Sequence, residues 1–168
     1  MTEPRPPMTL ARAAWLVQLA TTLPLVGLIW FVQLVAYPLF AHVPPEAFPA
    51  YHAAHSHLIG FLVAPLMMAE LGAALAFAAD PGGLCSRRAA LAGLALALVA
   101  WGVTFLVSVP QHAVLGAGFE ADAHAVLVGS NWLRTVAWTA RGALLIGPLL
   151  RPLATLSVPA GPSPTRPL

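Results

Sequence analysis

Charge is what this 168-residue sequence lacks most: it contains no lysine, and only 8% of its residues are charged. Soluble domains carry about 25% charged residues, which cover their surface. Hydrophobic residues make up 59% of the chain, and its mean hydropathy is +0.80. These values favour an integral membrane protein, with an unusually apolar soluble helical domain as the alternative.

Cysteine is nearly absent too. The single cysteine, Cys85, excludes an intramolecular disulfide and any Cys-x-x-Cys metal or redox motif. The eight basic residues are all arginine, the formal net charge is only +2, and no basic patch is interleaved with aromatic residues. The sequence therefore predicts no nucleic-acid partner. The expected partners are the lipid bilayer and a small lipophilic molecule.

Four apolar segments are long enough to cross a bilayer as helices, which takes about 20 residues each. They cover residues 14–37, 58–78, 89–109 and 132–150. We predict an all-α fold, an integral membrane four-helix bundle within residues 14–153. Residues 1–13 and 154–168 are expected to be tails, the second one disordered because it is rich in proline and has no apolar periodicity.

Proline and glycine define the connections between these segments. Three prolines lie in residues 42–50, and a proline inside a helix removes a backbone hydrogen bond. We expect residues 108–131 to be an irregular connection beginning near Pro110, with a short interfacial or re-entrant helix over 121–128. The first apolar segment continues to about Phe40, too far for a cleaved signal peptide, so we expect it to stay as a span.

Arginine placement predicts the orientation. Six arginines lie before the first segment, between the second and third segments, or after the fourth, while the two other connections carry acids and no arginine. Cytoplasmic loops are enriched in arginine and lysine. The N- and C-termini are therefore predicted to be cytoplasmic, and the other two loops extracytoplasmic, in a multi-pass protein of the inner (plasma) membrane.

All six histidines lie near the predicted outer side. His52 and His55 are three residues apart and share a helical face. Such a pair can hold a divalent metal when further ligands come from elsewhere, and His112 and His124 are the candidates. Three interpretations stay open: an interfacial or structural role, a metal site of these four histidines, or metal-free acid/base and substrate contact.

Three ionisable residues lie inside the predicted spans: Glu70 in the second, and Arg134 and Arg141 in the fourth, with Trp138 on the same helical stripe. A charged side chain in hydrocarbon costs roughly 2.5–3.5 kcal/mol, so it usually faces the bundle interior. Glu70 and Arg141 form a structural ion pair in one interpretation. In the other, the two arginines bind an anionic substrate group against Trp138. The two are compatible if Glu70 positions Arg141.

Uncharged polar residues supply further candidates. Gln33 and Tyr37 share a helical face of the first span, and Asn131 flanks the stripe of arginines. Interhelical hydrogen bonding is the usual role of such residues. Contact with a bound substrate is the alternative.

Three stretches carry a family resemblance. They are AYPLF (36–40), YHAAHSHLIG (51–60) with PLMMAE (65–70), and NWLRTVAWTAR (131–141). They resemble small four-helix membrane proteins of largely unassigned function, a group similar to the anthrone-oxygenase-like family, over most of residues 14–150. The resemblance implies oxidation of polycyclic phenols by O₂ without a bound cofactor. By that analogy the site residues would be His52, His55, Arg134, Trp138 and Arg141.

The sequence as a whole predicts a membrane-embedded oxidoreductase-like enzyme that acts on a small lipophilic substrate near the outer leaflet. The expected catalytic residues are His52, His55, Arg134 and Arg141. The expected substrate contacts are Trp138, Asn131, Tyr37 and Gln33. The alternative is a non-enzymatic metal- or ligand-binding, sensing or accessory subunit of a membrane complex. Either protein could be a homo-oligomer.

Overall fold

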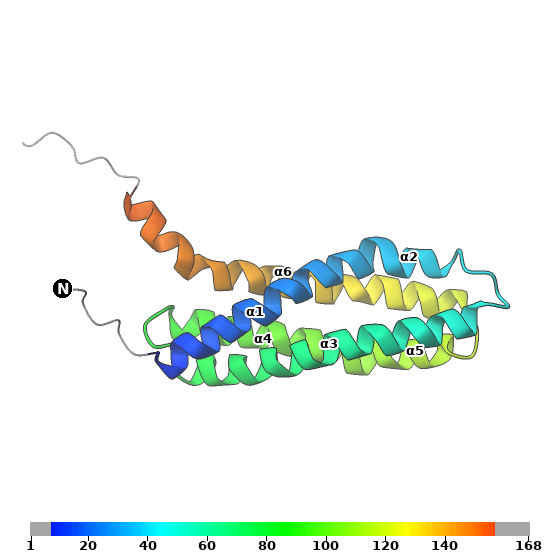
Figure 1. The fold of residues 1–168 in the computed structure, drawn as a ribbon, viewed down its shortest axis with the longest axis horizontal. Helices are drawn as coiled ribbons and strands as arrows, with labels where there is room; N and C mark the ends of the chain where they lie inside the picture. Colours follow the sequence, from blue (N-terminus) through cyan, green and yellow to red (C-terminus); the bar gives the residue numbers. More distant parts are fainter. Residues whose placement is uncertain (1–7, 157–168) are drawn as a thin grey trace, which may run out of the picture.

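The computed structural model describes residues 8–156, and this part of the chain folds into four antiparallel helical rods (Figure 1). Two of the rods contain short π-helical segments, η1 and η2. In chain order the elements are α1 (Leu10–Phe31), η1 (Val32–Ala36), α2 (Tyr37–Phe40), α3 (Phe48–Ala79), α4 (Arg87–Val103), η2 (Thr104–Ser108), α5 (Val109–Leu115) and α6 (Ala121–Leu156). The predicted all-helical fold of four helices is confirmed.

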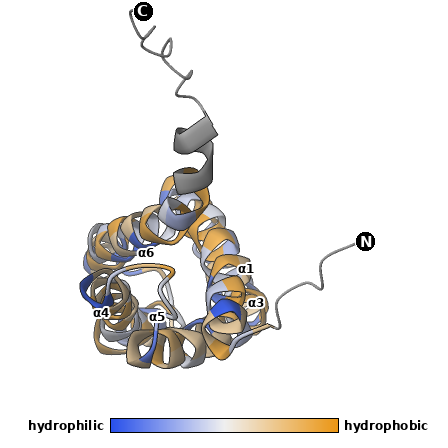
Figure 2. Ribbon diagram, turned by 90° about the vertical axis from the view of Figure 1, so that its left-hand side faces the viewer, coloured by the Kyte–Doolittle hydropathy of each residue, from blue (hydrophilic) through white to orange (hydrophobic). Residues whose placement is uncertain are grey.

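Three of the rods are long and apolar enough to cross a membrane: Leu10–Phe40, Phe48–Ala79 and Arg87–Leu115. The fourth rod, α6, carries more charge and is not among them. Large apolar side chains are exposed on the outside of the bundle, including Phe61 at 82% exposure and Leu106 at 79%. Apolar residues make up much of the ribbon in Figure 2. A soluble monomer rarely exposes such a continuous apolar surface.

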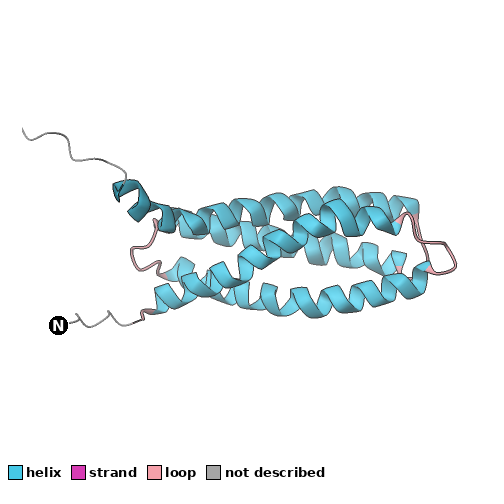
Figure 3. Cartoon of the chain, turned by 45° about the horizontal axis from the view of Figure 1, so that its top comes forward, coloured by secondary structure: helices cyan, strands magenta, loops and turns pink. Residues whose placement is uncertain are grey.

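The short loops lie at the two ends of the bundle (Figure 3). Residues 80–86 join α3 to α4 at the end where α1 begins, and residues 41–47 and 116–120 lie at the other end. The turn after α3 needs glycine, because Gly82 and Gly83 have φ angles of 56° and 77°. A β-carbon on Gly82 would also lie 2.6 Å from that of Ala11. The start of α1 therefore packs directly on this turn.

The two π-helical segments explain why two prolines do not break their helices. Pro38 and Pro110 cannot donate to the carbonyls four residues earlier, Leu34 and Leu106, which lie in η1 and η2. The wider π turn shifts the bonding, so that the residue before each proline donates to the carbonyl five residues back. The first rod thus continues beyond Pro38 to Phe40, and the third continues beyond Pro110 to Leu115.

One predicted boundary is wrong for this reason. Residues 108–131 are not an irregular connection, because the third rod continues to Leu115 and α6 begins at Ala121 without a separate short helix. The second rod, Phe48–Ala79, includes the predicted span over 58–78 together with the residues before it. At the ends, α1 begins inside the predicted 1–13 tail and α6 continues past 153, while residues 1–7 and 157–168 lie outside the described residues.

The core divides into three apolar layers along the bundle. Ala14, Phe77 and Ala90 form the layer nearest the 80–86 turn. A middle layer surrounds Trp138, and it contains Leu25, Ile29, Met67 and Ala100. The layer nearest the other two loops contains Val32, Ala36, Tyr37, Phe40, Phe48, Leu115, Ala123 and Leu127. Buried polar groups lie between these layers, and they form the site described next.

Candidate functional site

The predicted ion pair between Glu70 and Arg141 is present, and both side chains are 0% exposed. Arg141 Nε donates to Glu70 Oε1 over 2.9 Å and to Thr22 Oγ1 over 3.3 Å. Its Nη2 donates to Gln18 Oε1 over 2.7 Å, and its Nη1 donates to the Gly93 carbonyl. Each nitrogen of this guanidinium therefore has a partner inside the protein.

The carboxylate of Glu70 completes this network. It accepts a hydrogen bond from Thr22 Oγ1 over 2.6 Å and another, at its second oxygen, from Trp138 Nε1 over 3.0 Å. Together with Arg141, these contacts join α1, α3, α4 and α6. We assign Arg141 to this structural clamp, because it has no nitrogen left without a partner to meet a substrate.

Arg134 is in the opposite situation. Its side chain is 9% exposed, and its Nη1 donates to two hydroxyls, Thr104 Oγ1 over 3.3 Å and Ser108 Oγ over 3.1 Å. Its Nε is buried and has no hydrogen-bond partner. Among the described residues the Arg141–Glu70 contact is the only ion pair, so no carboxylate balances this cation. A buried charge without an opposite charge is costly unless something else compensates for it.

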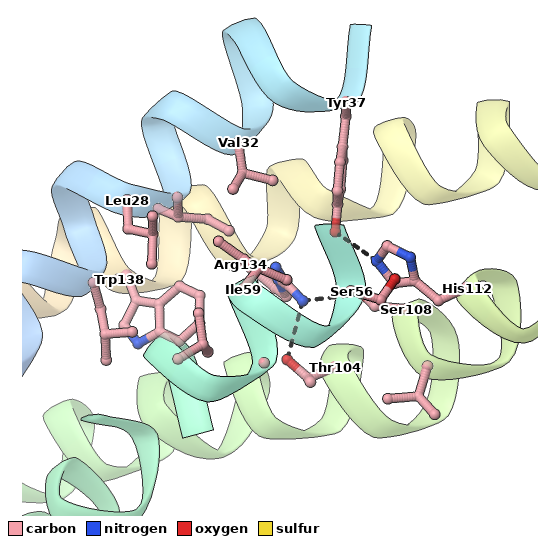
Figure 4. Close-up of a pocket in the computed structure, with 15 residues that line it drawn as sticks. Leu28, Val32, Tyr37, Ser56, Ile59, Thr104, Ser108, His112, Arg134 and Trp138 are labelled. Carbon is pink, nitrogen blue, oxygen red and sulfur yellow. Dashed lines mark hydrogen bonds between the residues drawn. The ribbon is translucent and has the colours of Figure 1, made fainter. Parts of the chain in front are cut away.

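Arg134 faces a cavity of about 240 Å³ (Figure 4). The indole ring of Trp138 lies 5.6 Å from its guanidinium carbon, which places the cation against an aromatic wall. The polar wall is completed by Tyr37, Ser56, Thr104, Ser108 and His112. The other lining residues are glycine or aliphatic: Leu25, Leu28, Ile29, Val32, Ile59, Gly60, Val63 and Val109. An apolar cavity with one cation in its wall can hold a lipophilic anion.

A chain of hydrogen bonds leads away from this cavity. The Tyr37 hydroxyl lies 3.1 Å from His112 Nε2, and His112 Nδ1 lies 2.9 Å from His52 Nε2. His124 Nε2 donates to the backbone carbonyl of Tyr37 over 2.8 Å, which fixes the helix that presents the tyrosine. With the Tyr37 hydroxyl donating to His112 Nε2 and the His112 Nδ1–H donating to His52 Nε2, both hydrogen bonds of the chain have one donor and one acceptor. Such a chain can carry a proton between Tyr37 and His52.

Aromatic rings fill the end of the bundle beyond this chain. Phe40 is completely buried, and its ring centroid lies 4.9 Å from that of His55 and 5.7 Å from that of His52. The ring of Phe48 stacks on His52, with centroids 5.6 Å apart. His55 Nε2 is buried and has no partner. His52 and His55 therefore pack among aromatic rings, with His52 reaching the cavity only through His112.

The side chains of the four predicted metal ligands do not converge on one point. His52 and His112 are hydrogen-bonded to each other, and His124 is directed at a backbone carbonyl. Within residues 8–156, no three His, Cys, Asp or Glu side chains are placed to hold a metal ion together. The metal site of His52, His55, His112 and His124 stays a prediction, and the geometry that is present is that of a hydrogen-bonded chain.

Gln33 and Asn131 contact each other rather than the cavity. Asn131 Nδ2 donates to Gln33 Oε1 over 2.8 Å, and Gln33 Nε2 donates to the Val128 carbonyl over 3.3 Å. This is an interhelical hydrogen bond between η1 and α6, the usual role of such residues between apolar helices. Of the four predicted substrate contacts, Tyr37 and Trp138 line the cavity, and Gln33 and Asn131 are not among its lining residues.

Sequence reasoning missed Thr104, Ser108 and Ser56. Thr104, Ser108 and His112 are spaced four residues apart and present one polar face toward Arg134 and Tyr37. This spacing can be recognised in the sequence only if one assumes a single helix that continues through Pro110. The prediction of an irregular connection over 108–131 therefore hid the polar face.

No family model, no curated protein and no solved structure matches this chain in comparisons with known proteins. The function must therefore be argued from the geometry of the cavity and its polar wall.

Removing one partner of the clamp is expected to destabilise the fold strongly. Arg141→Ala leaves the Glu70 carboxylate buried without its cation, so we expect a loss of about 3–5 kcal/mol in the free energy of unfolding. Unfolding in mixed detergent micelles, followed by tryptophan fluorescence, measures this loss. Arg88→Ala removes an exposed arginine and is the control, expected to cost little. Equal stability of the Arg141 and Arg88 variants would contradict the clamp.

Proposed function

We propose that this chain is a multi-pass protein of the plasma membrane with both termini in the cytoplasm. Three rods long and apolar enough to cross a membrane support insertion, as does the apolar outer surface. Arg12, Arg87 and Arg88 lie at one end of the bundle, while the loops at the other end carry Glu46 and Glu120. The positive-inside rule then directs the first end toward the cytoplasm.

Cysteine labelling in intact cells tests this orientation. In a Cys85→Ser background, Glu46→Cys and Glu120→Cys should react with a membrane-impermeant maleimide, because both positions are exposed in the outer loops. Ser86→Cys, in the turn at the other end, should react only after the cells are opened. Labelling of Ser86→Cys in intact cells, without labelling of the two loop cysteines, would show that the orientation is the opposite of the one proposed.

The site itself supports an enzyme that acts on a small lipophilic molecule with an acidic group, such as a phenol or an enol. The observation that carries this proposal is Arg134, a buried cation with a partnerless Nε and no carboxylate, in the wall of an otherwise mostly apolar cavity. An anionic oxygen at this Nε would supply the missing partner and the opposite charge. Trp138 would then lie beside the ring of an aromatic ligand.

Cavity size narrows the ligand class. An apolar protein cavity of about 150 Å³ can bind benzene, and this cavity measures about 240 Å³. A fused two-ring aromatic molecule with one hydroxyl is therefore a suitable size. The aliphatic residues Leu25, Ile29 and Val63 would surround its rings, and the hydroxyl would lie on the polar side.

The proposed chemistry begins with ionisation of the bound hydroxyl. Arg134 would stabilise the developing oxyanion in a site with little water, where such electrostatic stabilisation is strongest. The hydrogen-bonded pair of Tyr37 and His112 would take up the proton, and His52 would share it. An ionised phenol is easily oxidised, which agrees with the oxidoreductase class and the O₂ chemistry that the resemblance to the anthrone-oxygenase-like family implies.

Binding of 2-naphthol to the protein in lipid nanodiscs tests the role of Arg134. We expect Arg134→Gln to weaken binding by about tenfold or more, because a charge-assisted hydrogen bond contributes about 1.5–3 kcal/mol. Equilibrium dialysis against empty nanodiscs measures the specific part. The matched ligand is 2-methylnaphthalene, which has the rings but no acidic hydroxyl, so its affinity should change little.

An Arg134→Gln variant that binds 2-naphthol as tightly as the wild type would refute this site. Oxygen uptake and loss of naphthol in the same nanodiscs then separate the two classes of function. Turnover supports the oxidoreductase, whereas specific binding that depends on Arg134 but yields no product indicates a ligand-binding or sensing protein.

A second variant tests the proton acceptor. His112→Phe keeps an aromatic ring in place but removes both hydrogen bonds, so bound 2-naphthol should stay neutral and lose its naphtholate absorption band. We expect the affinity to fall by less than about tenfold, because Arg134 still contacts the oxygen. His57→Phe, at an exposed position of α3 near the same end of the bundle, is the control. An unchanged naphtholate band in His112→Phe would exclude His112 as the acceptor.

A further inference from the structure

The cavity reaches the outer surface on one flank of the bundle. Two residues that line it are themselves exposed: Gly60 on α3, and Val109 on α5, which is 50% exposed. The other lining residues are buried or half-buried. Gly60 and Val109 belong to rods that are neighbours in the bundle, so the surface opening lies between α3 and the η2–α5 segment.

Packing closes the cavity along the bundle axis. Toward the outer loops, Phe40, Phe48, Leu115 and Leu127 are each fully buried in one apolar layer. Toward the other end, the cavity is closed by Trp138 and Leu25, with the clamp of Glu70 and Arg141 beyond them. A ligand arriving from the aqueous ends would have to displace one of these layers.

The bundle is less closely packed on the flank between α3 and α5. α3 packs against α1 over much of its length, but it meets α5 at only a few positions. Gly60 has no side chain, and a β-carbon built there would have no other atom within 4 Å. The glycine therefore leaves open space at the surface end of the cavity.

A polar group without a partner marks the same opening. Ser56 lies one helical turn before Gly60 on α3 and lines the cavity. Its Oγ is buried and has no hydrogen-bond partner. A hydroxyl group passing the opening could bond to Ser56 first and then to the groups around Arg134.

We infer that the cavity is filled from the hydrocarbon of the membrane, through a lateral opening bordered by Ser56, Gly60 and Val109. This inference rests on the proposed function and specifies its substrate class: a weak acid that dissolves in lipid in its neutral form. A preformed anion would be excluded by the cost of carrying charge through hydrocarbon. The acid gives up its proton only after its hydroxyl has reached Arg134.

The rate of 2-naphthol binding in nanodiscs tests the opening. Gly60→Trp places a large ring at its border, so we expect the association and dissociation rates both to fall by at least about tenfold, with a smaller change in Kd. Gly72→Trp is the matched control, because Gly72 lies on the same helix, is exposed and also has open space around a β-carbon. Its rates should equal those of the wild type. Stopped-flow fluorescence measures both rates.

Val109→Trp narrows the opening from the opposite helix and should slow both rates in the same way. If Gly60→Trp fills the cavity and abolishes binding at equilibrium, the rates measured with Val109→Trp still test the opening. Wild-type rates in Val109→Trp, or in a folded Gly60→Trp protein, would overturn the lateral opening. If the wild type binds 2-naphthol no more tightly than Arg134→Gln does, the proposed function is refuted. That result differs from wild-type rates in the tryptophan variants, which refute only the lateral opening.

Discussion

The hydrogen-bonded ion pair of Arg141 and Glu70 is the contact on which the rest of the bundle depends. In a membrane, apolar burial does not hold helices together, because lipid chains are as apolar as leucine. Polar contacts and close packing must do so, and this network joins α1, α3, α4 and α6 at one level. Glu70 also bonds to Trp138, which fixes one wall of the neighbouring cavity.

Two arginines on one helix thus have opposite roles. Arg141 lies next to Glu70, the only buried acid among the described residues, and all three nitrogens of its guanidinium donate to protein groups. Arg134, about two turns away, has two hydroxyl partners and a partnerless Nε. Both carboxylate oxygens of Glu70 accept hydrogen bonds within the clamp, so Glu70 does not pair with Arg134. Arg134 is therefore left available for a ligand. The structural ion pair that the sequence predicts is present at Arg141, and the anion site at Arg134 stays a proposal.

Part of this arrangement could be predicted from the sequence. The helical fold follows from the apolar segments, and the pair of Glu70 and Arg141 follows from the cost of charge in hydrocarbon. The different roles of Arg134 and Arg141 could not be predicted, because they depend on which helix faces bring Gln18 and Thr22 to Arg141. The polar face of Thr104, Ser108 and His112 was hidden by Pro110, since sequence rules give no sign that a π turn will carry a helix through a proline. The contact between Gln33 and Asn131 could not be predicted either, because nothing in their spacing shows that they meet each other.

The most direct test of the account is an experimental structure of the protein in lipid with 6-bromo-2-naphthol bound. The account predicts bromine density inside the cavity beside the aliphatic wall, with the naphthol oxygen within hydrogen-bonding distance of Arg134 Nε. An oxygen directed away from Arg134, or a carboxylate found paired with that nitrogen in the ligand-free protein, would contradict it.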